Sequence, residues 1–269
     1  MPANEDTAVP KFAANLSFIF QEVGFLDRFA AAAACGFKAV EYLSPYEHPP
    51  EVISEQLSRH GLVQALFNMP PGDWAVGERG IAALSGREQE FRDGLEKALI
   101  YAKATNCRLV HAMAGVLPAG NDRVAAERTY VANLQYAAER LAREGITVTI
   151  EPINNRDIPG YFLNTTTQAM SIIERVGHPN LKLQLDLYHV QIMEGDLAHR
   201  MRTLAGHYPH VQIAGNPGRN EPDVGEINYP FLFDLFDELG YSGWIGCEYR
   251  PKGETRTGLG WAKRYGIQG

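Results

Sequence analysis

Short runs of apolar and β-branched residues alternate along this chain with longer segments in which apolar residues recur every three or four positions. The first pattern indicates buried strands, and the second indicates amphipathic helices that cover them. A glycine or asparagine stands before most of the apolar runs, and these residues most easily adopt the left-handed conformation that ends a helix. We predict eight strands, within residues 11–20, 37–43, 62–67, 107–113, 146–152, 178–186, 207–214 and 241–249.

Amphipathic segments separate the predicted strands. The clearest of them cover residues 25–34, 88–104, 126–143 and 229–239. Strand and helix alternating eight times predicts an α/β protein with a single (β/α)₈ barrel, the TIM barrel. An open, doubly wound parallel sheet is the alternative. No low-complexity linker divides the chain, so we predict one barrel domain over residues 11–269 after a flexible N-terminal tail at 1–10.

Four of the predicted strands end in a side chain that carries oxygen. The runs TVTIEP, LKLQLD, HVQIA and WIGCEY bring Glu151, Asp186, Gln212 and Glu248 to matching positions. In a closed barrel the C-terminal ends of the strands meet at one face, where active sites are built. Such side chains would be costly to bury together without a cation. The pattern therefore predicts a site for one hard divalent ion, Mg²⁺ or Mn²⁺.

Glu151 and Glu248 are the candidates for acid–base chemistry. A carboxylate on each side of a substrate can take a proton from one carbon and return it to the next. A metal ion would assist by polarising the adjacent carbonyl group. One strand-end carboxylate alone more often caps a helix or pairs with an arginine, but four oxygen-bearing side chains at matching strand ends favour a site.

Three further residues are weaker candidates. His189, in DLYH, could donate a hydrogen bond to a substrate or be a buried core histidine. Arg219, in NPGRNEP, could bind a carboxylate with two parallel hydrogen bonds or be a solvated loop residue. His111 follows another apolar run and is a candidate for the pocket wall.

Two long segments, 68–88 and 216–229, follow predicted strands and lack a clear helical or strand pattern. Loops of this length are typically functional or disordered. They are rich in glycine yet hold Trp74 and Arg79 in the first and Arg219 and Glu226 in the second. We interpret them as a substrate lid, with ordinary surface loops as the alternative.

Composition excludes several classes of protein. The formal net charge is −7, from 25 basic and 32 acidic residues, without a basic cluster, which argues against binding to nucleic acid. Three widely spaced cysteines are typical of reduced core thiols in a cytoplasmic protein. No apolar run approaches the roughly twenty residues that span a bilayer, and the N-terminus does not resemble a signal peptide. No dinucleotide-binding or P-loop motif is present, so we expect no nucleotide cofactor.

Long segments of the chain resemble the hydroxypyruvate isomerase family. That family includes the 2-oxo-tetronate isomerases and belongs to the wider xylose isomerase-like barrel group. The resemblance runs from about residue 11 to residue 262 and includes IEPINNRDIPGYFL, LDLYHVQIMEGD and GWIGCEYRPKGETRTGLGW. The other similar segments are 12–20, 67–80, 113–120 and 210–233.

The resemblance implies that one divalent metal is held by Glu151, Asp186, Gln212 and Glu248. It also implies that the two glutamates are the proton donor and acceptor. In related ketose epimerases, the histidine of a DxxH motif, an arginine after the seventh strand and an acidic residue six positions beyond the first glutamate contact substrate. These positions correspond here to His189, Arg219 and Asp157. The epimerases have histidine where this chain has Gln212, which indicates the isomerase branch.

The expected reaction converts hydroxypyruvate to tartronate semialdehyde (2-hydroxy-3-oxopropanoate) by proton transfer through an enediolate. The alternative substrate is 2-oxo-tetronate, which carries one more hydroxymethyl unit and which residues 101–120 and 210–253 favour by resemblance. Residues 67–80 and 151–154 favour hydroxypyruvate. The expected partner is thus a small hydroxy-oxo acid, and a homo-oligomer is compatible with the group by analogy.

Other functions on a similar barrel are alternatives to this one. An inosose-dehydratase-like lyase would eliminate water instead of moving a proton, and a ketose epimerase would act on longer neutral sugars. A nuclease related to endonuclease IV would need a histidine-rich zinc cluster and a basic groove, whereas this chain has 8 histidines and a charge of −7. A non-catalytic binding protein would be expected to lack one of the four metal ligands.

Overall fold

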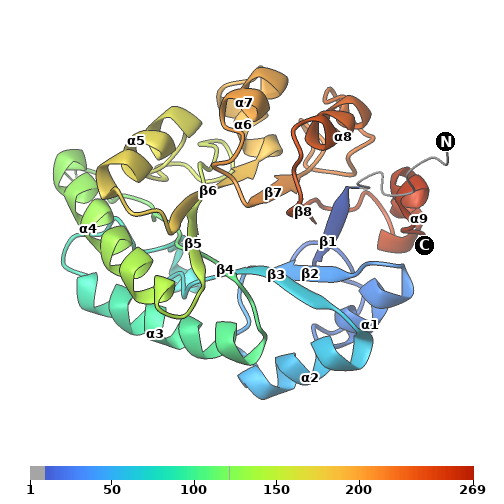
Figure 1. Ribbon diagram of the computed structural model, residues 1–269, viewed down its shortest axis with the longest axis horizontal. Coiled ribbons are helices and arrows are strands. Elements are labelled where there is room, and N and C mark those ends of the chain that lie inside the picture. The colour runs from blue at the N-terminus through green and yellow to red at the C-terminus, as the bar shows by residue number, and fades with distance from the viewer. Residues whose placement is uncertain (1–9, 121) are drawn as a thin grey trace, which may run out of the picture.

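Eight parallel strands close into a barrel in the order of the chain, and helices surround it (Figure 1). The structure is a computed structural model that describes residues 10–120 and 122–269, so residues 1–9 of the predicted tail lie outside it. The predicted barrel is confirmed, and the open sheet is excluded because β1 also pairs with β8. The strands are β1 (Lys11–Asn15), β2 (Ala39–Tyr42), β3 (Val63–Asn68), β4 (Leu109–His111), β5 (Thr147–Ile150), β6 (Leu181–Asp186), β7 (His210–Ile213) and β8 (Trp244–Cys247).

The helices lie close to the predicted segments, and α3 has the predicted bounds 88–104. The region between β6 and β7 differs from a simple alternation, since it holds two short helices in place of one. The helices are α1 (Asp27–Ala34), α2 (Pro50–His60), α3 (Glu88–Ala104), α4 (Arg123–Ala142), α5 (Thr166–Val176), α6 (Leu187–Met193), α7 (Leu197–Thr203), α8 (Tyr229–Glu238) and α9 (Thr255–Gly258), with 3₁₀ turns η1 (Trp74–Val76) and η2 (Leu259–Tyr265).

Alternation along β5, β6 and β7 separates apolar side chains of the outer layer from polar side chains of the inner one. In β6, Leu181, Leu183 and Leu185 are buried in the main hydrophobic core, while Gln184 and Asp186 take the intervening positions. Because successive side chains point to opposite faces of a strand, these two belong to the barrel interior. The same alternation continues on the neighbouring strands, so the sequence that builds the core also directs polar groups toward the centre.

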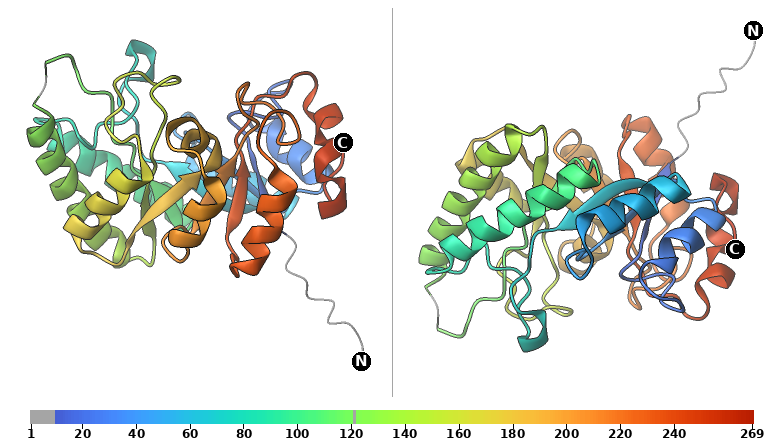
Figure 2. Two further views of the ribbon diagram at one scale, coloured as in Figure 1. Left: turned by 90° about the horizontal axis from the view of Figure 1, so that it is seen from above. Right: turned by 90° about the horizontal axis from the view of Figure 1, so that it is seen from below.

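The segment after β3 is pinned to the next strand rather than free. Gly80 forms an isolated bridge with Ala114, and a side chain at Gly80 would come within 2.3 Å of the Met113 carbonyl oxygen. The predicted loop contains only η1, where Trp74 is 43% exposed and the Arg79 guanidinium lies 3.7 Å from its ring centroid. In the side views this segment and the loop after β5 project from the same face (Figure 2).

Two predictions from composition concern features that the structure describes, namely the cysteines and the lack of a membrane-spanning segment. Cys35, Cys107 and Cys247 are free thiols, and all three are buried. Among residues 10–120 and 122–269, none of the helices has the length and apolar character needed to cross a membrane.

Candidate active site at the C-terminal mouth of the barrel

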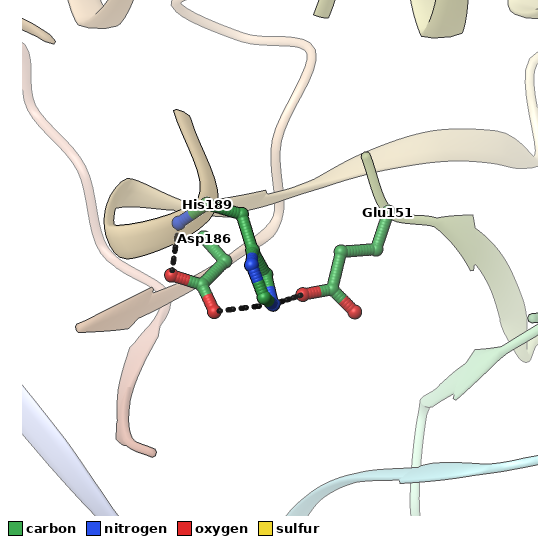
Figure 3. A group of neighbouring side chains, drawn as sticks. All are labelled: Glu151, Asp186 and His189. Atoms are coloured by element: carbon green, nitrogen blue, oxygen red, sulfur yellow. Dashed lines mark hydrogen bonds and ion pairs between the residues drawn. The ribbon is translucent and has the colours of Figure 1, made fainter. Parts of the chain in front are cut away.

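Glu151 and Asp186 stand at the ends of the neighbouring strands β5 and β6, with His189 between them (Figure 3). Asp186 is also the N-cap of α6: its Oδ1 accepts hydrogen bonds from the backbone amides of Tyr188 (2.7 Å) and His189 (3.4 Å). Its Oδ2 lies 3.6 Å from His189 Nε2, which is 3.8 Å from Glu151 Oε1. Potential ligand atoms of all three residues lie within 4.8 Å of one another, and all three residues are buried.

The hydrogen bonds around His189 determine which of its ring nitrogens carries the proton. Asn154 Oδ1 accepts from the backbone amides of Arg156 (3.0 Å) and Asp157 (2.8 Å), so its Nδ2 is the donor to His189 Nδ1 at 2.6 Å. Nδ1 is therefore an acceptor, and the hydrogen of the neutral ring is on Nε2. Burial, reinforced by the charge of Arg219, lowers the pKa of His189 well below its ordinary value and keeps the ring neutral. His189 thus presents an N–H donor to the space beside Glu151 and Asp186.

Gln212 and Glu248 lie on the other side of the mouth and are joined through amide groups. Gln212 Nε2 and Asn15 Nδ2 both donate to Glu248 Oε2, at 2.5 and 3.0 Å. The same two amides donate to Oε1 of a further carboxylate, Glu41, each at 2.8 Å. Gln212 Oε1 accepts from Gln184 Nε2 at 2.6 Å, so the carboxamide oxygen faces the β5–β6 side.

Glu41 is a residue that the sequence analysis missed. It is on β2, is fully buried, and reaches across the barrel interior, where its Oε2 lies 2.5 Å from His210 Nε2 on β7. A side chain at Gly246 would come within 2.3 Å of the Glu41 carboxylate, so β8 leaves room for it. The sequence does contain a pattern that indicates Glu41. The run KAVEY carries this acid near the strand end, in the same way that HVQI carries Gln212.

Glu41→Gln is expected to lower turnover about 10- to 100-fold, the usual effect of losing a side chain that orients a ligand. A neutral amide at this position would place an NH₂ group against Asn15, Gln212 or His210, leaving a buried donor unpaired at a cost of about 1–3 kcal/mol. Steady-state rates and thermal unfolding would measure both effects. Glu55→Gln, on the exposed face of α2, is the matched control. Full activity and an unchanged melting temperature for Glu41→Gln would contradict this orienting role.

Arg219 is held among three of the acidic side chains by its guanidinium group. It pairs with Glu248 Oε1, with Asp157 Oδ2 at 3.2 Å and with Asp186 Oδ2 at 3.9 Å. Its guanidinium carbon lies 4.8 Å from the ring centroid of Phe18 and 5.0 Å from that of Tyr188. The backbone of Arg219 has a φ of 54°, in the left-handed region that is uncommon for a non-glycine residue. The loop after β7 therefore holds the guanidinium of Arg219 in ion pairs with these carboxylates.

Crowded carboxylates in a buried setting raise one another's pKa values. Burial raises the pKa of Glu151 well above its ordinary value, and the charges of Glu248 and Asp186 raise it further. Burial raises the pKa of Glu248 to about 8 and that of Asp186 to about 6, although Arg219 lowers both. Groups with pKa values moved toward neutrality are suited to proton transfer, and an added cation would relieve the repulsion.

The residues present fit a divalent cation. Glu151 Oε1 has no hydrogen-bond partner among the described residues, and it lies beside the carboxylate of Asp186. The atoms nearby that could bind a metal ion are mainly carboxylate and carboxamide oxygens, which suit Mg²⁺ or Mn²⁺. The N–H of His189 points into this space, so the ring in this state serves as a hydrogen-bond donor rather than as a ligand.

The structure brings all the candidate residues to one face of the barrel. Asp157 follows β5 and binds Arg219, while its other oxygen accepts from the Tyr188 hydroxyl at 3.3 Å. His111, the pocket-wall candidate, is fully buried with its Nδ1 3.5 Å from Glu151 Oε2 and 3.2 Å from Asn68 Oδ1. Burial lowers the pKa of His111 to about 3. The roles assigned to these residues from the sequence remain predictions.

Comparisons with known proteins identify relatives along nearly the whole chain. A family profile described as xylose isomerase-like TIM barrel matches residues 29–265. A 2-oxo-tetronate isomerase of Cupriavidus necator is 55% identical over 257 residues, covering 96% of this chain and 99% of that protein. A hydroxypyruvate isomerase of Escherichia coli is 48% identical, covering 95% of this chain and 99% of that protein. A crystal structure described as AP endonuclease, family 2, from Brucella melitensis has a TM-score of 0.94 at 54% identity, covering 95% and 99% of the two chains.

Proposed function

The chain belongs to the xylose isomerase-like TIM barrel family, and we propose that it is an isomerase that interconverts the ketone and aldehyde, or two ketone, forms of a short hydroxy-oxo acid. The observation that carries the proposal is the pair Glu151 and Glu248. Both are buried at the mouth of the barrel, directly after β5 and β8, which are three positions apart in a ring of eight strands. Two carboxylates that face one site from different sides suit the removal of a proton from one carbon and its delivery to the next.

For hydroxypyruvate, one glutamate takes a proton from C3 and the resulting electron pair forms the C2–C3 double bond of an enediolate. The other glutamate donates a proton to C2, and the hydroxyl proton moves from the oxygen on C3 to the oxygen on C2. The product is tartronate semialdehyde, with no net oxidation. Arg219 lies beside Glu248 and balances its charge, while the N–H of His189 is placed to bind a substrate oxygen.

Glu151, Asp186, Gln212 and Glu248 would hold a divalent metal at this site, in agreement with the strand-end pattern. When bound, Mg²⁺ or Mn²⁺ would polarise the ketone and the neighbouring hydroxyl and so make the carbon-bound proton more acidic. Hydrogen bonds from Asn15, to Glu41 and from Gln184 fix the orientation of Glu248, Gln212 and Glu151, respectively. The fourth side chain, Asp186, is fixed by the backbone amides that it caps.

A second candidate substrate is 2-oxo-tetronate, in which the same proton transfer converts a 2-oxo acid to a 3-oxo acid. The observation in its favour is the 55% identity to a 2-oxo-tetronate isomerase, against 48% to a hydroxypyruvate isomerase. The two acids differ by one hydroxymethyl unit, which a pocket discriminates strongly only if it binds the extra hydroxyl.

Proton NMR of each acid with the purified protein in D₂O tests the proposal. We expect interconversion that depends on added Mg²⁺ or Mn²⁺, and the acid with the higher kcat/KM identifies the substrate. A sample without enzyme controls for spontaneous exchange at C3. The absence of interconversion with both acids in the presence of metal would refute the proposal, and a dehydrated product would indicate a lyase instead.

A further inference from the structure

A cavity of about 1170 Å³ opens at the ends of β1, β2, β3 and β8. Two of its lining residues connect it to the site. Asn68 contacts His111, the neighbour of Glu151, and the ring of Phe18 lies under the guanidinium of Arg219. This cavity is the space that the non-reacting end of a substrate would enter.

The proposed substrate brings an anionic carboxylate of its own to a face that already holds four buried acidic side chains. A further anion at such a place is stabilised only by a cation that is not already neutralised. Arg219 does not meet this condition, because Glu248 and Asp157 bind its guanidinium. A divalent ion held by Glu151, Asp186 and Glu248 would not meet it either, because three carboxylates already exceed its charge. The carboxylate therefore requires another partner.

Three arginine or lysine side chains line the cavity: Arg28, Lys97 and Arg250. Arg28 is already engaged, since its Nη1 and Nε donate to backbone carbonyl oxygens at 2.7 and 3.1 Å. Lys97 is on α3, and its Nζ lies 4.8 Å from the ring centroid of Tyr46, with which it makes a cation–π contact. Within the described part of the chain, the guanidinium of Arg250 has neither an ion pair nor a hydrogen bond.

The position of Arg250 is fixed by its backbone. It comes two residues after Glu248, its N–H donates to the Arg219 carbonyl at 2.7 Å, and its carbonyl accepts from Asn220 Nδ2 at 2.8 Å. Its guanidinium carbon lies 6.0 Å from the centroid of Phe18, the ring that Arg219 also contacts. Arg219 and Arg250 thus both lie near the ring of Phe18. Arg250, which lines the cavity, is exposed, and among the described residues its guanidinium has no ion pair or hydrogen bond.

We propose that Arg250 binds the carboxylate of the substrate through its guanidinium group and thereby makes this site select hydroxy-oxo acids over neutral ketoses. This inference rests on the proposed isomerase function. The planar guanidinium can donate two parallel hydrogen bonds to a carboxylate, which gives both charge and orientation. Arg250 acts on the end of the substrate that does not react, so its contribution is to binding rather than to proton transfer.

The test compares wild type, Arg250→Gln, Arg250→Lys and Lys97→Met, each loaded with the same metal. Substrates are the acid that wild type converts faster and dihydroxyacetone, in which hydroxymethyl replaces the carboxylate of hydroxypyruvate. We expect Arg250→Gln to raise KM for the acid about 10- to 100-fold, the effect of losing hydrogen bonds to a charged group, with kcat changed much less. Turnover of dihydroxyacetone should be unaffected, Arg250→Lys should be intermediate, and Lys97→Met should match wild type.

Three results would overturn the proposal: an unchanged KM for the acid in Arg250→Gln, an equal loss for the acid and the neutral ketose, or a loss carried by Lys97→Met instead. The wild-type measurement separates this inference from the one on which it rests. If wild type converts neither acid, the isomerase function fails and the role of Arg250 with it. If wild type converts the acid and Arg250→Gln binds it equally well, only the role of Arg250 fails.

Discussion

Replacing Glu151 or Glu248 with glutamine is expected to slow isomerisation by about 10²–10⁴-fold, the usual contribution of a positioned acid or base. A carboxamide keeps the shape of the side chain but cannot take or give a proton. The measurement is the rate of interconversion by NMR, with Glu55→Gln on the exposed face of α2 as the control. Near-normal turnover of either variant would remove that residue from the proton-transfer role.

Deuterium exchange would also distinguish the two glutamates. The variant that retains the base for C3 should still exchange the C3 protons of hydroxypyruvate with D₂O, although it no longer forms product. The variant that lacks this base should do neither. If both variants exchange equally, a single group serves both carbons.

Loss of activity in Glu151→Gln should not come from unfolding. Burial and neighbouring charges raise the pKa of this carboxylate, so at neutral pH its ionised form lowers the stability of the folded state. An uncharged amide removes this repulsion and can still accept from Gln184 Nε2, which donates to Glu151 at 3.1 Å. In metal-free protein, the melting temperature of Glu151→Gln is therefore expected to equal or exceed that of wild type.

Removal of metal is expected to abolish turnover, by about a thousandfold or more, since Lewis-acid catalysis supplies several kcal/mol. Among residues 10–120 and 122–269, the buried carboxylates at the mouth outnumber the arginine side chains that pair with them, since Arg219 alone does so. The measurement is the rate after dialysis against a chelator and again after addition of Mn²⁺ or Mg²⁺, with metal content determined by elemental analysis. Far-ultraviolet circular dichroism of the dialysed protein controls for loss of fold.

Ca²⁺ provides a matched control for the metal experiment, because it prefers more ligands at longer distances and should restore little activity. The prediction would be contradicted by a dialysed sample that contains no metal yet turns over at the original rate. Full recovery with Ca²⁺ would show that charge alone suffices and that the ligand geometry is not selective.

The sequence was sufficient to predict the barrel and the four strand-end residues at its mouth, because both depend on the pattern of neighbouring residues along the chain. Alternating apolar runs identify strands, and each of Glu151, Asp186, Gln212 and Glu248 lies at the end of such a run or one residue from it. Parallel strands in a closed ring must bring their ends together, so no distant contact had to be known in advance.

The contacts between those residues could not be predicted in the same way. Glu41 meets Gln212 and His210 only because the barrel closes and places β2 within reach of β7 across its interior. The pairing of Arg219 with Glu248 depends on the path of a long loop, including a left-handed residue, and sequence patterns do not determine such a path.

The N-cap of α6 makes the site accessible to spectroscopy. The backbone amides of Tyr188 and His189 donate hydrogen bonds to Asp186 Oδ1. The chemical shifts of these amides therefore depend on the charge of that carboxylate. In a nitrogen-15 NMR spectrum these two resonances would move when Asp186 gains a proton or a ligand, without any label inside the cavity. The hydrogen bonds that cap this short helix therefore make two backbone amide signals sensitive to whether a proton or a ligand is bound at Asp186.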